Sequence, residues 1–163
     1  MALSLSDADI NSLLESDPYF LGVNMNDEKL DLQSTGYHIL NLQNSNQGGS
    51  HWTLLYHKPF GFIYSDPFGS PPTKKIMKIL KATGEPIMIN KRIYQSIKSS
   101  YCGYFSMITA QLLRGCKSRE EVSKVFDTEL SRYKEMLDTR EQCPVDKEDE
   151  LPIQFFKDLK SEK

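Results

Sequence analysis

Four residues of this sequence are of the types that thiol-dependent hydrolysis requires. Cys102 carries a thiol, and His51 carries an imidazole that can accept the thiol proton. Asp66 can orient that imidazole, while the amide of Gln95, seven residues before Cys102, can stabilise an oxyanion. A cysteine protease needs a thiolate, a base, a group that holds the base and donors for the oxyanion. The sequence therefore supports a cysteine-protease hypothesis in which every role has a candidate.

The helix predicted to begin at the cysteine gives the thiol a favourable position. The run from Cys102 to Leu113 contains no proline and is followed by Gly115, so we expect a buried helix with Cys102 at its N-terminus. The N–H groups and the dipole at a helix N-terminus favour a thiolate and lower the pKa of a thiol from about 8.5. Gly103 has no side chain that could obstruct a substrate backbone.

Two apolar and aromatic runs, His51 to His57 and Phe60 to Tyr64, predict the elements that hold the histidine and the acid. The runs are separated by Lys58-Pro59 and are followed by the turn sequence Asp66-Pro67-Phe68-Gly69. This pattern is typical of adjacent antiparallel strands. In such a hairpin His51, at the start of the first strand, is a neighbour of Asp66, at the end of the second.

Each of these residues also has a structural explanation. A cysteine that opens a helix is more often a small buried hydrophobic residue than a nucleophile. Asp66 could simply begin a turn, and Gln95 could be a solvated loop amide. His57, six residues after His51 and on the same strand face, is the rival base, although its place before Lys58-Pro59 favours a solvated strand end. The joint occurrence of the four residue types is what favours catalysis.

The other cysteines do not indicate a second site. Cys116 follows Cys102 by fourteen residues, about 21 Å along a continuous helix, so the two cannot share a disulfide or a metal ion. Cys143, next to Pro144, is expected to be an exposed thiol. With no CxxC pair among the three cysteines, the sequence indicates neither a disulfide framework nor a zinc knuckle, and a reducing compartment fits better.

Four segments, in this order along the chain, resemble the adenovirus maturation protease family, which includes relatives carried by virophages and Polinton-type elements. The segments are Pro18-Tyr19-Phe20-Leu21-Gly22, Gly49-Ser50-His51-Trp52, Asp66-Pro67-Phe68-Gly69, and Gln95 with Cys102-Gly103-Tyr104-Phe105. The similarity runs from Pro18 to about Leu113. The order of histidine, acid, glutamine and cysteine is shared with SUMO-deconjugating proteases and is reversed from papain. Adenoviral enzymes have glutamate where this chain has Asp66, whereas SUMO proteases have aspartate.

The resemblance implies a papain-like cysteine endopeptidase that cleaves viral precursor proteins, such as capsid or core components, during virion maturation. It implies catalytic roles for His51, Asp66, Gln95 and Cys102, and it places Trp52 behind the histidine. The protein would then act in the virion and at the assembly site in the cytoplasm or nucleus of the host cell. Two alternatives stay open: an isopeptidase that removes SUMO or ubiquitin, and a non-enzymatic, DNA-associated virion protein with a protease fold.

A basic stretch from Lys74 to Lys98 holds seven basic residues and one acid, Glu85. Lys74, Lys78 and Lys81 fall at helical spacings of four and three and therefore share one helix face. A solvated helix face explains the pattern, and so does contact with DNA phosphates. Because adenoviral members use DNA and a peptide as activators, the resemblance makes these lysines candidates for DNA contact. No cofactor is expected besides such an activator.

The remaining pattern predicts an α+β fold in which helices pack on a small, mostly antiparallel sheet. Capping residues predict a helix after Ser6 or Asp7, one from Thr73 through Ala82 that ends at Gly84, and one from Ser118 to Leu137. The last of these begins with a capping box formed by Ser118 and Glu121. A short helix is predicted at Asn26 to Leu32 and another near Phe155 and Phe156, with further strands at Tyr37 to Leu42 and Pro86 to Asn90.

Length and composition limit the broad class of the protein. A chain of 163 residues, 39% of them apolar, predicts one domain over residues 1–163, and the acidic stretch Asp146 to Glu150 predicts some mobility within 138–163. The 20 Lys and Arg residues nearly balance 22 Asp and Glu residues, which argues against a surface that binds polyanions throughout. No apolar run of about eighteen residues and no signal-peptide pattern is present, so we expect a monomer that neither enters a membrane nor is secreted.

Overall fold

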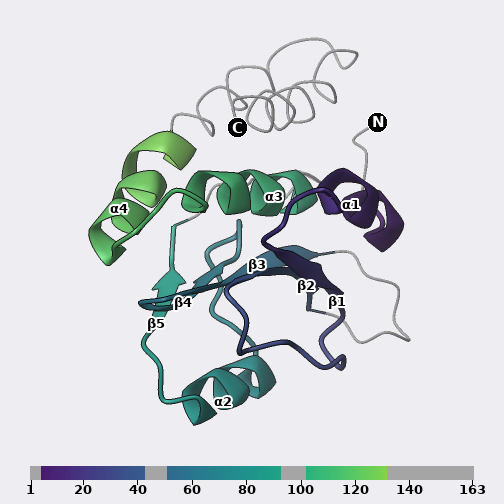
Figure 1. The fold of residues 1–163 in the computed structure, drawn as a ribbon, viewed down its shortest axis with the longest axis horizontal. Helices are drawn as coiled ribbons and strands as arrows, with labels where there is room; N and C mark the ends of the chain where they lie inside the picture. The colour runs from purple at the N-terminus through teal and green to yellow at the C-terminus, as the bar shows by residue number, and fades with distance from the viewer. Residues whose placement is uncertain (1–4, 43–50, 93–101, 132–163) are drawn as a thin grey trace.

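The computed structural model describes residues 5–42, 51–92 and 102–131. These ranges form an α+β fold with one mixed five-stranded sheet (Figure 1). The strands are β1 (Phe20–Asn24), β2 (Gly36–Asn41), β3 (Trp52–Lys58), β4 (Gly61–Ser65) and β5 (Ile87–Asn90). The helices are α1 (Asp7–Leu14), α2 (Lys74–Ala82), α3 (Cys102–Leu113) and α4 (Arg119–Lys124), and α4 continues into a π-helical turn, η1 (Val125–Glu129).

The sheet has the strand order β1-β2-β3-β4-β5. Its two inner pairs, β2 with β3 and β3 with β4, are antiparallel, whereas the outer pairs, β1 with β2 and β4 with β5, are parallel. The prediction of a mostly antiparallel sheet is therefore wrong. Parallel neighbours need a crossover connection, which hairpin signals in a sequence do not reveal. Between β4 and β5 the crossover contains α2.

The helices cover both faces of the sheet. Figure 1 shows α1, α3 and α4 on one face and α2 on the other. Alternate residues of each strand point to opposite faces, so the sheet separates two apolar cores. The larger core, under α3, includes Ile39, Leu54, Ile63 and Ile108, while the smaller core, under α2, includes Leu40, Leu55, Tyr64 and Leu80. This arrangement makes α3 the central buried helix that its apolar sequence predicted.

Hydrogen bonds at both ends of α3 fix its position along β3. Near the start of the helix, the Ser106 hydroxyl donates to the Trp52 carbonyl over 3.1 Å. Beyond its last residue, the Lys58 ammonium donates to the Arg114 carbonyl over 3.0 Å. Because Trp52 begins β3 and Lys58 ends it, α3 runs in the same direction as β3. The first turn of α3 therefore lies at the end of the sheet where β3 begins.

A buried polar cluster anchors the far half of α3 to the chain before β1 and to β2. The Gln111 amide donates to Asp17 over 3.1 Å, and the Tyr37 hydroxyl donates to the same carboxylate over 2.6 Å. Burial opposes ionisation of Asp17, but the donated hydrogen bonds and the nearby Arg114 outweigh it and lower the pKa of this carboxyl. The carboxylate thus stays charged and satisfied, which is the condition under which a buried acid is tolerated.

Several predicted elements agree with the structure. Ser6 caps α1 and Thr73 caps α2, each through its hydroxyl. Gly84, just beyond α2, has a φ of +77°, which explains why a glycine ends that helix. Helix α3 has the predicted bounds, and β3 pairs with β4 as the predicted hairpin.

The helix predicted at Asn26 to Leu32 does not form. Local side-chain bonds compete with helical ones, since the Glu28 carboxylate accepts from the Met25 N–H and the Asp31 carboxylate accepts from two later N–H groups. A helix of seven residues would rise only about 10 Å, whereas this segment returns along the full length of a strand to begin β2. Leu30 packs under α2 instead.

Two further differences concern β1 and α4. Strand β1 was not predicted, because its residues were read only as part of a matching motif. The Ser118 hydroxyl accepts from the Glu121 N–H, but the Glu121 carboxylate accepts from the Lys117 N–H, so the predicted capping box is only half formed. The helix also changes to a π turn at Val125. Its predicted continuation to Leu137, and the helix near Phe155 and Phe156, lie outside the described residues.

Candidate active site

The described part of the site is a histidine and an acid at one end of the sheet. His51 immediately precedes β3, and Asp66 immediately follows β4, so antiparallel pairing of the two strands brings them together. The Nε2 atom of His51 lies 2.7 Å from Oδ1 of Asp66. Of the Asp66 side chain only 1% is exposed, against 19% for His51. The acid is therefore shielded from solvent, whereas the imidazole ring is partly exposed with its Nδ1 atom buried.

A tight turn after β4 fixes the Asp66 carboxylate. The Phe68 N–H donates to Oδ1 over 2.8 Å, and the Gly69 N–H donates to the Asp66 carbonyl over 2.7 Å. Gly69 has a φ of +75°, which glycine adopts without strain. Asp66 thus begins a turn, as its structural explanation expects, and the same carboxylate also contacts His51.

The hydrogen bond to Asp66 determines which ring nitrogen of His51 is basic. A buried carboxylate in this position accepts hydrogen bonds, so Nε2 is the nitrogen that carries hydrogen. In the neutral ring the other nitrogen, Nδ1, then carries the lone pair. The carboxylate also stabilises the imidazolium that forms when Nδ1 takes a proton. The arrangement can therefore act as a general base.

Phe68 completes the surroundings of the imidazole and was missed in the sequence. Its ring stacks on that of His51, with centroids 4.6 Å apart and planes inclined by 17°. The turn sequence Asp66-Pro67-Phe68-Gly69 could have indicated it, because an aspartate side chain often accepts a hydrogen bond from the N–H two residues later, which places Phe68 next to Asp66. Trp52, which the resemblance put behind the histidine, is 2% exposed and donates from its indole N–H to the Leu5 carbonyl over 2.9 Å.

The first turn of α3 packs against the residues next to His51. A Cβ atom placed on Gly103 would lie 3.0 Å from Leu5 Cδ1 and 3.3 Å from Trp52 Cδ1. The glycine was expected to leave room for substrate, but its missing side chain points towards these core residues. Close approach of α3 to Trp52 is thus the physical reason for a glycine here. It brings the start of the helix beside the strand that His51 precedes.

The other two predicted catalytic residues are only partly described. Cys102 is the first residue of α3, as the sequence predicted, but its side chain lies outside the description. Gln95 lies within 93–101 and Cys143 within 132–163, and both ranges are outside the described residues. The structure therefore brings together His51, Asp66 and the start of α3, while the catalytic roles stay predictions.

Comparison of the sequence with protein-family models and with curated proteins finds no match in either case.

The other two histidines, the rival base His57 and His38, have other partners. His57 lies near the opposite end of β3, where Nε2 is 2.9 Å from Glu85 and Nδ1 is 3.0 Å from the Ser34 carbonyl. His38 is buried, and its Nδ1 lies 2.6 Å from the Asn24 side chain. Burial lowers the pKa of His38 and outweighs the opposing effect of Asp31. Both residues bind neighbouring segments of the fold and lie apart from the His51–Asp66 pair.

The described ranges also bear on Cys116, on metal binding and on membrane-spanning helices. Cys116 is buried, and its thiol donates to the Leu112 carbonyl over 3.8 Å. In the ranges that the structure describes, no group of three His, Cys, Asp or Glu residues could hold a metal ion. Nor does any helix in those ranges have the length and apolar character to cross a bilayer.

The lysines predicted as DNA contacts form one exposed row. Lys74, Lys78 and Lys81 are all exposed on α2. Figure 1 shows α2 on the sheet face opposite to α3. The sheet therefore lies between these lysines and the start of α3. An activating effect of DNA would have to act through the sheet or by concentrating enzyme and substrate on one polymer.

Proposed function

We propose that this chain is a cysteine endopeptidase in which Cys102 is the nucleophile and His51 is its base. The observation that carries the proposal is the 2.7 Å contact between His51 Nε2 and Asp66 Oδ1 at the end of the sheet where α3 begins. A buried carboxylate that holds an imidazole, beside a helix with cysteine as its first residue, supplies the base, its orienter and the nucleophile. The resemblance adds the order of these residues and the glutamine at position 95.

The proposed reaction follows from these assignments. Nδ1 of His51 accepts the thiol proton, and the Cys102 sulfur attacks the carbonyl carbon of the peptide bond. The Cys102 N–H and the Gln95 amide donate to the oxyanion of the tetrahedral intermediate. The imidazolium then gives its proton to the departing amine, which leaves an acyl-enzyme. Water, deprotonated by His51, attacks the thioester and restores the thiol.

The substrates we propose are viral precursor proteins, capsid or core components, cleaved in the virion or at its assembly site in the host cell. This part of the proposal comes from the motif resemblance. An isopeptidase would use the same residues but would cleave a bond to a lysine side chain after a folded SUMO or ubiquitin domain. The substrate, and not the catalytic set, distinguishes the two.

Two assays run in parallel test the proposal. The wild-type protein is incubated with a peptide library and with SUMO and ubiquitin conjugates, and the products are identified by mass spectrometry. We expect the wild type to cleave linear peptides and to release neither SUMO nor ubiquitin. Cys102→Ala should abolish the peptide cleavage. Release from the conjugates without peptide cleavage would instead support the isopeptidase. Cleavage of neither would leave a non-enzymatic protein with this fold.

A further inference from the structure

Two buried polar atoms at the candidate active site have no hydrogen-bond partner among the described residues. One is Oδ2 of Asp66, whose other oxygen accepts from the Phe68 N–H and contacts His51. The other is the hydroxyl oxygen of Tyr64, a side chain that is fully buried. A buried polar atom without a partner destabilises a fold, most strongly when the group is charged. Both atoms therefore need a partner, which a protein interior supplies as a protein group or a buried water.

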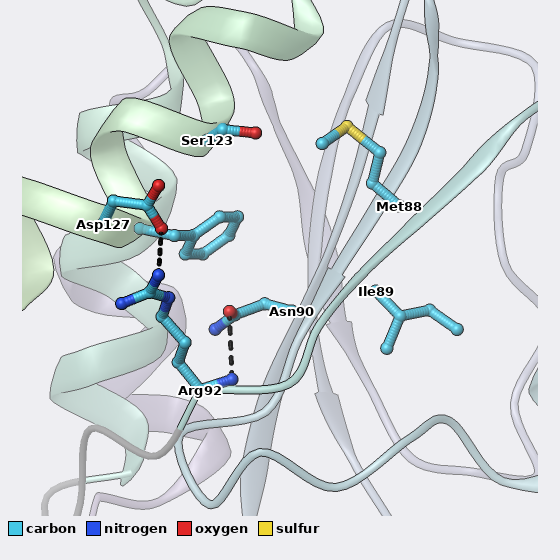
Figure 2. A pocket seen from close by; sticks show the side chains of 7 residues that line it. Met88, Ile89, Asn90, Arg92, Ser123 and Asp127 are labelled. Carbon is cyan, nitrogen blue, oxygen red and sulfur yellow. Dashed lines mark hydrogen bonds and ion pairs between the residues drawn. The ribbon is translucent and has the colours of Figure 1, made fainter.

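Tyr64 and Asp66 belong to the same face of the sheet, and Ser65 between them belongs to the other. Tyr64 packs in the smaller core under α2, and residues two apart along a strand share a face. The Ser65 hydroxyl accepts from Asn90 Nδ2 over 3.4 Å on the opposite face. Figure 2 shows Asn90 on the side of α4, where its side-chain oxygen accepts from the Arg92 N–H over 3.2 Å. Ser65 therefore bonds away from the two unpaired atoms.

Thr53 shows where the Tyr64 hydroxyl lies along the strand. The register of β3 against β4 places Thr53 opposite Asp66. Burial raises the pKa of Tyr64, the nearby Thr53 hydroxyl opposes this rise, and the charge of Asp66 adds to it. The phenol is thus close to both residues, and its hydroxyl lies towards the end of β4 that Asp66 follows. The Thr53 hydroxyl itself donates to a backbone carbonyl of β2 over 3.4 Å and makes no hydrogen bond with Tyr64.

A single water molecule can satisfy all three side chains. Residues two apart on one strand are about 6.6 Å apart, and a water that bridges two oxygen atoms spans about 5.6 Å, or two hydrogen bonds. Such a water accepts from the Tyr64 hydroxyl, donates one hydrogen to Oδ2 of Asp66 and donates the other to the Thr53 oxygen. Three hydrogen bonds are typical of a buried water.

We infer that a buried water joins Tyr64 to Oδ2 of Asp66, and that Tyr64 is a positioning residue for the acid that orients His51. With Oδ2 held, the carboxylate cannot turn about its Cβ–Cγ bond, and Oδ1 stays directed at His51 Nε2. Tyr64 acts through Asp66 and takes no part in the proposed chemistry. The effect on turnover rests on the proposed peptidase function, whereas the water site does not.

Tyr37 offers a matched control. It is also a fully buried strand tyrosine, and its hydroxyl donates to the buried carboxylate of Asp17 over 2.6 Å. Tyr37→Phe and Tyr64→Phe therefore remove the same hydroxyl group from the neighbourhood of a buried carboxylate. Only the second carboxylate is the one that contacts His51.

A double-mutant cycle tests the positioning role. Steady-state kinetics on a cleaved peptide compare wild type, Tyr64→Phe, Asp66→Ala and the double variant. Tyr64→Phe should lower kcat by about twofold to tenfold in the wild type, the factor of one net hydrogen bond, with KM unchanged. It should have no further effect in the Asp66→Ala background, because the carboxylate it orients is gone.

Tyr37→Phe should leave kcat unchanged in both backgrounds. An equal loss from Tyr64→Phe with and without Asp66 would show a merely structural role and overturn the inference. So would a loss from Tyr37→Phe as large as that from Tyr64→Phe.

A high-resolution crystal structure of the full chain tests the water site directly. We expect one ordered water within hydrogen-bond distance of the Tyr64 hydroxyl, Oδ2 of Asp66 and the Thr53 oxygen, and we expect Tyr64→Phe to displace it. A wild-type structure without a water between these groups would overturn the inference.

The two measurements also separate this inference from the proposed function. If the wild type cleaves no peptide but its crystal structure contains the water, the water site stands and the peptidase proposal fails. If the wild type cleaves peptides but the water is absent, or Tyr64→Phe leaves kcat unchanged, the inference fails and the peptidase proposal stands.

Discussion

His51 and Asp66 are fifteen residues apart in the sequence, yet Nε2 of the histidine lies 2.7 Å from Oδ1 of the acid. The antiparallel pairing of β3 with β4 creates this contact, and the turn after Asp66 orients the carboxylate through the Phe68 N–H. In the structure as it stands, Asp66 already orients the His51 imidazole, without a shift of β3 or β4.

Loss of the base should reduce turnover more than loss of the acid. His51→Ala removes the group that moves the proton. General acid–base catalysis by one side chain typically raises the rate by about a hundredfold to ten-thousandfold, so kcat should fall by a similar factor. Asp66→Asn keeps a side chain of the same shape and removes only the charge that orients and stabilises the imidazolium, so its effect on kcat should be smaller. Glu85→Gln, which alters the carboxylate next to His57, is the matched control and should leave kcat unchanged. Equal losses from Glu85→Gln and Asp66→Asn would favour a structural role for Asp66.

Gln95 should contribute to the rate of the chemical step. If its amide donates to the oxyanion, Gln95→Ala should lower kcat by about tenfold to a thousandfold, because the lost hydrogen bond is strongest in the transition state. Steady-state kinetics on a cleaved peptide give kcat and KM separately. A raised KM with unchanged kcat would instead assign Gln95 to substrate binding.

The exposed lysines of α2 should give DNA binding that depends steeply on salt. Each phosphate contact releases about one counterion, so replacing Lys74, Lys78 and Lys81 by Gln should reduce the slope of log K against log salt by about three. If DNA is an activator, duplex DNA at low salt should raise the cleavage rate of the wild type and not of the triple variant.

A control variant separates this row of lysines from net charge. The control replaces three other exposed lysines by Gln and so changes the net charge by the same amount. These are Lys29, Lys117 and Lys124, which do not share one helix face. This control variant should bind DNA as the wild type does and show the same rise in cleavage rate with duplex DNA. Anisotropy titrations of labelled duplex measure both variants, and absence of binding by the wild type at low salt would end the DNA hypothesis.

His38 should make the stability of the fold depend on pH. Burial lowers the pKa of this imidazole below its ordinary value of 6.5. The unfolded chain therefore binds more protons than the folded chain just below pH 6.5, and the free energy of unfolding should fall as the pH is lowered from there through the folded pKa. The slope from one group is at most about 1.4 kcal/mol per pH unit.

Urea unfolding of wild type and His38→Gln between pH 8 and pH 5 measures this effect. The variant should be less stable at pH 8, because it loses a buried contact with Asn24, but its stability should change less with pH. A wild type and a variant with parallel pH profiles would show that His38 does not titrate with unfolding.

The sequence was most informative where chemistry and local structure coincide. Thr73, Gly84 and the proline-free run to Leu113 predicted α2 and α3 because caps and apolar runs act locally. The His51–Asp66 contact was predicted because a hairpin joins residues close in sequence. Strand β1 and the mixed sheet were not predicted, since parallel pairing depends on crossovers between distant segments. Phe68 was missed for a different reason: the turn after Asp66 signals the position of its N–H, but not the stacking of its ring on His51.

The proposed peptidase activity requires Cys102 to be an activated nucleophile whose proton passes to His51. The direct measurement is the rate of alkylation by iodoacetamide at each cysteine, followed by mass spectrometry in wild type and in His51→Ala. We predict that Cys102 of the wild type reacts well before Cys143 and buried Cys116, that His51→Ala slows Cys102 alone, and that peptide hydrolysis stops as Cys102 is modified. Alkylation of Cys102 no faster than that of Cys143, with hydrolysis that survives it, would contradict the account.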